Sequence, residues 1–188
     1  MTHMKDSEFY DSFEHILEDG LIKVCRGAGL VGDTLLRSDD IDGKWDDYIK
    51  DYVADAVENF NQYPEAAISW AGFLGIGVAH WWDVNWQGHR NDSYSSFYGS
   101  RGWDDMDEHV LRDLLGLKLD GKEAKKISDT MLSCALATLG LLRHEGIETQ
   151  TERGFFVLTR SYSVLYRIGA GIELQRLGYK AVPIQIRK

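Results

Sequence analysis

The sequence has few of the residues that divide a chain or cross-link it. It contains two prolines and two cysteines in 188 residues, with no Pro/Ser-rich linker and no internal repeat. Cys25 and Cys134 lie among apolar residues and form no CxxC or zinc-ligand spacing. We interpret both as reduced thiols in a core, which predicts a reducing compartment, the cytoplasm. The chain is therefore expected to form a single domain over residues 1–188.

A long hydrophobic run is also missing. The longest apolar stretch, 66–82, has 17 residues and is interrupted by Ser69, His80 and three glycines. A helix needs about 20 apolar residues to cross a bilayer. The first twenty residues contain no apolar segment of the kind found in secretion signals. These observations predict a chain without a membrane partner.

Positive charge is scarce in the first part of the chain. The net charge is −9, and residues 1–110 hold 22 acidic residues against 8 lysines and arginines. Residues 111–188 have the opposite balance, 8 acidic residues against 13 basic ones. The overall acidity argues against nucleic-acid binding. Two interpretations of the asymmetry remain open: the two parts attract each other when packed, or an acidic face binds a basic partner.

Signatures of common enzymes are absent. The sequence contains no GxSxG, HExxH or Walker motif, and no repeated ExxH of a di-iron bundle. Gly27, Gly29 and Gly32 have the spacing of a dinucleotide fingerprint, but a helical pattern precedes them and no parallel-sheet pattern follows. We interpret them as a helix stop. No cofactor is expected.

Helical periodicity dominates the rest of the chain. It predicts an all-α bundle of about six helices, with residues 1–5 disordered. Two helices, 64–86 and 154–178, are apolar nearly all round and are expected to be central. In the first of them, small residues recur every four positions at Ala67, Ala71, Gly75 and Ala79, which allows another helix to approach closely. A fourth helix is expected to begin near residue 103, with Asp105 and Glu108 as a capping box, and a fifth covers 121–145.

The second helix carries Asp47, Asp51, Asp55 and Glu58 on one face, opposite its apolar stripe. Spaced carboxylates of this kind could hold a hard cation such as Mg²⁺. The position opposite the apolar stripe favours a solvated acidic face instead.

Polar and aromatic residues gather where helix 64–86 meets a long, ordered loop predicted over 87–102. Long loops in compact domains often carry function. His80 and Asp83 are three residues apart and could ligate a metal or act as an acid/base couple, with His89 as a third ligand; the alternative is a buried structural pair. The candidate ligand-binding residues of this segment are His80, Asp83, Trp86, His89, Arg90, Tyr94 and Arg101.

Arg160 and Arg167 lie on the otherwise apolar helix 154–178. Buried arginines need carboxylate partners, and we expect these to be Asp83 or Glu173. The alternative is that both arginines line the same pocket as loop 87–102 and bind a small anionic ligand.

These observations together predict a non-enzymatic intracellular binding protein with an acidic surface, which binds a protein partner or a second copy of itself. The alternative is a small-molecule site where helix 64–86 meets loop 87–102. That site could belong to a metal-dependent hydrolase using His80, Asp83 and His89.

Overall fold

The computed structural model describes residues 2–181 and confirms a single-domain, all-α bundle. Helices account for the regular structure of these residues, and Gly99 and Gly102 form an isolated bridge. The expected extended segment at 181–186 lies, apart from Ala181, outside the described residues. The six α-helices are α1 (Thr2–Gly27), α2 (Asp39–Phe60), α3 (Pro64–His89), α4 (Met106–Glu108), α5 (Lys122–His144) and α6 (Glu152–Arg176).

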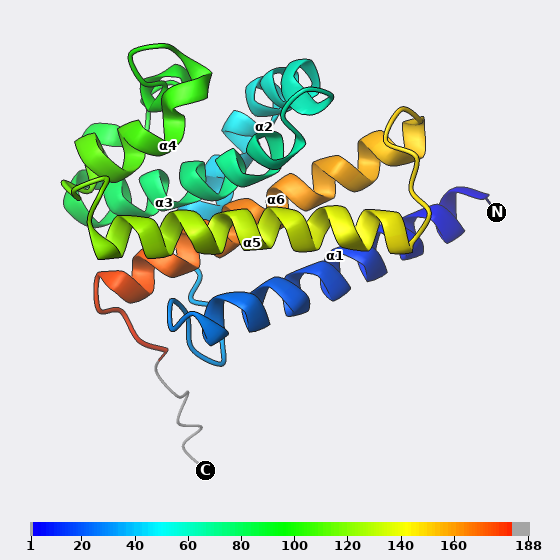
Figure 1. Ribbon diagram of the computed structural model, residues 1–188, viewed down its shortest axis with the longest axis horizontal. Helices are drawn as coiled ribbons and strands as arrows, with labels where there is room; N and C mark the ends of the chain where they lie inside the picture. Colours follow the sequence, from blue (N-terminus) through cyan, green and yellow to red (C-terminus); the bar gives the residue numbers. More distant parts are fainter. Residues whose placement is uncertain (1, 182–188) are drawn as a thin grey trace.

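Helices α3 and α6 form the centre of the bundle, as their apolar composition predicts. They pack against each other more extensively than any other two elements. Figure 1 shows them crossing the middle of the molecule, with α5 in front, α1 along one side and α2 on another. Glycines permit the close approach: a side chain at Gly169 would collide with the carbonyl oxygen of Gly72, and one at Gly75 with that of Tyr166. Small residues on α3 and α6 therefore set the distance between the central helices.

The boundaries of two helices differ from the expected ones. Helix α1 already begins at Thr2, and the segment contains no glycine or proline to stop the helix. Helix α3 has one residue with non-helical angles, Asn85. The Asn85 side chain accepts a hydrogen bond from the backbone N–H of Gly88 at 3.1 Å, which is the geometry of a helix N-cap. Asn85 thus ends one helix and starts a final turn up to His89.

The connection after α3 is shorter than predicted and partly helical. Because α3 includes residues 87–89, the loop proper starts at Arg90, and residues Tyr94–Phe97 form a 3-10 helix. A second 3-10 turn, Trp103–Asp105, leads into α4 and then into a π-helix, His109–Leu114. The expected capping box is wrong: Asp105 accepts hydrogen bonds from the backbone and side chain of Arg101, before the helix.

Among the described residues, no helix is both long enough and apolar enough to traverse a lipid bilayer.

Candidate functional site

The three residues proposed as metal ligands or acid/base groups have separate partners. His80 Nδ1 lies 3.1 Å from Oε1 of Glu173. The Asp83 carboxylate accepts a hydrogen bond of 2.7 Å from the hydroxyl of Tyr179. The expected His80–Asp83 pair is therefore replaced by two contacts with the C-terminal part of the chain. In sequence the residues are one helical turn apart, but α6 offers His80 a fully buried carboxylate.

His89 is held by neighbours of its own. Its ring stacks on Trp81 with centroids 4.6 Å apart and planes within 7°. Its Nδ1 atom lies 2.9 Å from Oδ2 of Asp92. Trp86, the other candidate of this turn, packs partly buried against the core. Within residues 2–181, no group of three His, Cys, Asp or Glu side chains is arranged to hold a metal ion.

The loop after α3 is fastened to α2 by side chains at its start. Buried Lys44 donates a hydrogen bond to the carbonyl oxygen of Arg90. The Tyr48 hydroxyl donates to the carbonyl of Asp92 at 2.7 Å. The Arg90 side chain itself is exposed. These contacts fix the backbone of residues 90–92 and leave the Arg90 guanidinium in solvent.

A second set of hydrogen bonds holds the loop against α2 a few residues further along. The hydroxyls of Tyr94 and Tyr98 both donate to Oδ2 of Asp55, the former at 2.8 Å. Burial, and then the negative charge of Asp55, raise the pKa of the Tyr94 hydroxyl, so it remains a donor at neutral pH. Arg101, at the far end, pairs with Asp105 at 2.7 Å. Of the predicted site residues, Tyr94 and Arg101 thus hold the loop in place.

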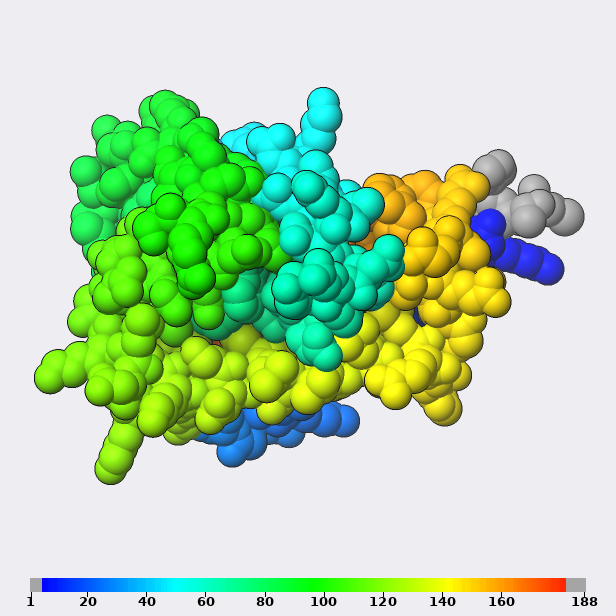
Figure 2. Space-filling model, turned by 45° about the horizontal axis from the view of Figure 1, so that its top comes forward, coloured from blue at the N-terminus to red at the C-terminus, as the bar shows by residue number. Residues whose placement is uncertain are grey.

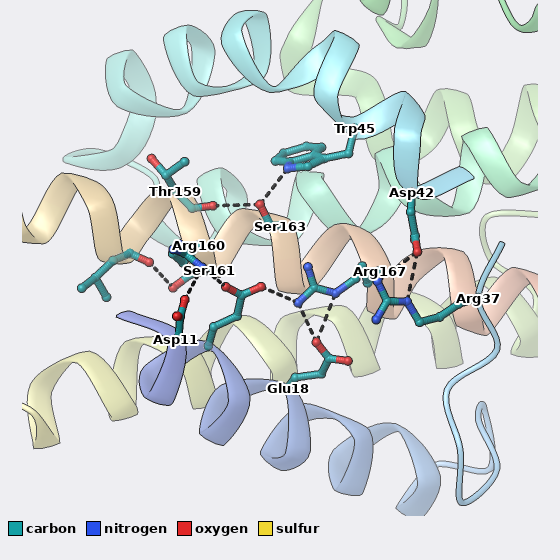
Figure 3. Close-up of polar contacts among 12 residues, drawn as sticks. Asp11, Glu18, Arg37, Asp42, Trp45, Thr159, Arg160, Ser161, Ser163 and Arg167 are labelled. Carbon is teal, nitrogen blue, oxygen red and sulfur yellow. Dashed lines mark hydrogen bonds and ion pairs between the residues drawn. The ribbon is translucent and has the colours of Figure 1, made fainter. Parts of the chain in front are cut away.

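Arg160 and Arg167 belong to a different part of the molecule (Figure 3). Both extend from α6 toward α1 and pair with Glu14, at 2.6 Å and 2.8 Å respectively. Arg160 also reaches Asp11, and Arg167 reaches Glu18. The prediction that Asp83 or Glu173 pairs with these arginines is wrong. The carboxylates of Asp83 and Glu173 contact other groups. The acidic side chains of α1 lie along the face of α6 that carries the two arginines.

These arginines line a polar cleft of about 370 Å³ between α1, α2 and α6. Its wall on the α2 side includes Trp45, whose indole N–H donates to Ser163 at 2.7 Å, and Asp42, which pairs with Arg37 (Figure 3). Residues of loop 87–102 do not line this cleft, so the predicted shared pocket of arginines and loop is not formed.

The cleft is unfavourable for an anion. With the ion-pair partners of the arginines included, five carboxylates accompany three guanidinium groups. Burial alone would raise the pKa of Glu14, but hydrogen bonds from Arg160 and Arg167 outweigh it and lower the pKa below its ordinary value. Glu14 is therefore ionised at neutral pH and already neutralises part of the arginine charge. An anionic ligand would have to displace a carboxylate that is held in place.

The acidic surface on α2 is the strongest remaining charged feature. Eight carboxylates and two lysines lie on this helix, and one of the lysines, Lys44, is buried. At 100° per residue, four of the acids fall within an arc of about 40°. We call these four the acidic stripe: Asp40, Asp47, Asp51 and Glu58, all exposed. Asp55, which the sequence places on the same face, is instead half-buried beneath the two tyrosines.

The sequence analysis did not predict the residues that form contacts with partners far away in the sequence. Glu14 and Glu18 have the helical spacing of a solvated face, and Lys44 looks like any surface lysine. Their roles depend on which helix packs beside them, and local spacing carries no signal for that. Searches against protein-family models, curated proteins and solved structures found no match to the chain in any of the three.

Proposed function

We propose that this protein is a non-enzymatic interaction protein that binds a basic protein partner through the outer face of α2. The observation that supports this most directly is the acidic stripe. It extends from Asp40 to Glu58, a rise of about 27 Å along the helix. Exposed charge of one sign on a rigid element guides the approach of an oppositely charged surface and selects against other partners.

The stripe is largely without internal counter-charges. Asp40 accepts one hydrogen bond from Trp82, and Asp47 pairs with Lys44. For Asp51 and Glu58, no ion pair or side-chain hydrogen bond occurs within residues 2–181. In contrast, the acids of α1 that face α6 are neutralised by Arg160 and Arg167. The acidic residues of α1 are thus neutralised where the helices pack, whereas those of the acidic stripe on α2 remain exposed.

The helix that carries the stripe is well anchored. Trp45, Tyr48 and Tyr52 on its other side are buried in the core. Tyr52 also donates a hydrogen bond to the carbonyl of Ala67 on α3. A partner would therefore meet a surface that needs little ordering on binding, which favours affinity.

The alternative functions have less support. His80, Asp83 and His89 have separate partners, and within the described residues no metal-binding group of three exists. The polar cleft already contains more carboxylates than guanidinium groups. We therefore propose neither a metal-dependent hydrolase nor an anion-binding site.

The test is a triple neutralisation, D47N/D51N/E58Q, on the acidic stripe. Partners are captured from the native cells, identified, and purified, and their affinity is measured by calorimetry at low and high salt. Exposed charge pairs contribute about 0.2–1 kcal/mol each. We expect the triple variant to bind about threefold to a hundredfold more weakly than the unaltered chain at low salt, with a smaller difference at high salt.

A matched control changes the net charge equally elsewhere. The variant E8Q/D104N/E145Q neutralises three exposed acids outside α2 and should leave the affinity unchanged. Equal affinities for the α2 variant, the control and the unaltered chain would overturn the proposal.

A further inference from the structure

The outer face of α5 exposes two leucines, Leu132 and Leu136, that no residue in the described part of the chain covers. Leu132 and Leu136 have exposed fractions of 47% and 50%. The buried side of the same helix is formed by residues such as Ile127 and Thr138, and the two leucines point about half a turn away from them. Figure 1 shows α5 running along the front of the bundle with no other element before it. Exposed apolar surface of this kind marks contact with another molecule.

The charges beside the leucines suggest what that molecule is. Asp129 and Arg143 are exposed, and neither has an ion-pair partner within the described part of the chain. Asp129 precedes Leu136 by seven residues and Arg143 follows it by seven. With Leu132 and Gly140 they lie within an arc of about 80° on the helix, an arc that also contains the exposed Lys122 and Lys125 near the start of α5. We call the five residues the α5 outer face: Asp129, Leu132, Leu136, Gly140 and Arg143.

This arrangement complements itself under a two-fold rotation. If two α5 helices cross antiparallel at Leu136, Asp129 of each copy lies level with Arg143 of the other. Leu132 of each copy meets Gly140 of the other, and Gly140 has open space where a side chain would stand. We propose that the α5 outer face is a self-association surface, and that the protein forms an antiparallel two-fold dimer through it.

The charges disfavour the parallel arrangement. Two parallel copies would oppose Asp129 to Asp129 and Arg143 to Arg143, and facing like charges are repelled. A basic or acidic foreign partner would satisfy only one of the two charges at the ends of the leucine pair. A second copy of the chain, placed antiparallel, satisfies both.

The apolar surface continues beyond the helix. Leu132 also borders a groove of about 320 Å³ lined by Tyr63, Trp70 and Met131. A stable interface needs about 800 Å² on each partner, and the groove extends the contact past a single helix face. Figure 2 shows α5, in the lower half of the view, and α2, near the top, on the surface with the start of α3 between them. The α5 outer face and the acidic stripe lie on different helices, α5 and α2.

The test is a charge-swap experiment on purified full-length chain, read by sedimentation velocity over a range of concentrations. The unaltered chain should sediment as a dimer at high concentration. Asp129→Arg opposes two arginines at each end of the interface, and Arg143→Asp opposes two aspartates. Each variant alone should dimerise at least about tenfold more weakly.

The two variants mixed in equal amounts should recover the dimer, because the arginine of one chain then faces the aspartate of the other at both ends. The double variant D129R/R143D should recover it without mixing. Both positions are exposed, so circular dichroism should show folded chains throughout. Any of three results would overturn the proposal. The unaltered chain stays monomeric, both charge reversals leave dimerisation unchanged, or the mixture of the two variants fails to recover the dimer.

Discussion

The Sγ atoms of Cys25 on α1 and Cys134 on α5 lie 3.6 Å apart in the core, as two free thiols. Both residues are fully buried, and 109 positions separate them in sequence. The hydrogen bond between them lowers the pKa of the Cys25 thiol and raises that of Cys134. Cys25 thus faces the only other cysteine of the chain.

We expect a thiol-specific oxidant such as diamide to join Cys25 and Cys134. A disulfide has sulfurs about 2.05 Å apart, so a small shift of α1 against α5 suffices. Closing a loop of this length restricts the unfolded chain, and the free energy of unfolding should rise by about 2–4 kcal/mol. Mass spectrometry reports the loss of two hydrogens, and urea denaturation with and without reductant reports the stability.

Cys25→Ser is the control for this experiment, since it should show neither effect. Thiols that remain fully open to alkylation after prolonged oxidation would contradict the predicted proximity.

The contact of α3 with α6 should be intolerant of a single added methyl group. We expect Gly169→Ala to lower the free energy of unfolding by about 1–3 kcal/mol or more, because its Cβ would collide with the backbone of Gly72 and force the helices apart. Gly20→Ala on α1 is the matched control. It has open space around the new atom and should stabilise the helix by up to about 1 kcal/mol. Equal effects of both substitutions in denaturation experiments would refute the close approach.

The loop after α3 should depend on Asp55. In Asp55→Asn the hydroxyls of Tyr94 and Tyr98 lose a charged acceptor, and hydrogen bonds to charged groups contribute about 1.5–3 kcal/mol. We expect faster amide hydrogen exchange in residues 90–99, measured by mass spectrometry. Asp51→Asn, one turn away and exposed, should leave the exchange rates unchanged. Identical exchange in both variants would show that the tyrosines do not hold the loop.

The ion-pair cluster on α1 should make stability depend on pH. The pKa of Glu14 is lowered in the folded state from an ordinary value of 4.5. Its contribution is therefore present above that value and is lost as the pH falls through the lower, folded-state pKa. We expect Glu14→Gln to cost about 2 kcal/mol at pH 7, and the difference from the unaltered chain to shrink in acid.

The control on the same helix is Glu8→Gln, at an exposed position, which should cost little at either pH. Urea denaturation at neutral and acidic pH measures both variants. A Glu14→Gln deficit that is equally large at both extremes would show that the carboxylate charge is not responsible.

The positions of the helices could largely be predicted from the sequence. The apolar stripes of α2 and α5, and the nearly all-apolar α3 and α6, each depend on residues three or four positions apart, and such spacing is read within one segment. The start of α1 and the start of α4 were harder to predict. Asp105 illustrates the reason: its side chain could cap the helix after it or bind Arg101 before it, and both use the same kind of hydrogen bond.

The candidate site was harder still to predict from the sequence. His80 and Asp83 are neighbours in sequence, and the expectation that they pair rests on that nearness alone. In the structure, each turns to a group from the C-terminal part of the chain, Glu173 and Tyr179. Local spacing ranks the nearest partner first, whereas the fully buried Glu173, already paired with Arg176 three residues away, also contacts His80 because α3 packs beside α6.

By itself, then, the amino-acid order determined the all-α class, the two central helices and the acidic outer face of α2, because these follow from periodicity within single helices. Only the tertiary structure decided that Cys25 meets Cys134, that Glu14 neutralises Arg160 and Arg167, and that Asp55 holds the loop. Such pairings join residues far apart in the chain. They depend on which helix faces pack against each other, and a one-dimensional pattern does not specify how those faces are matched.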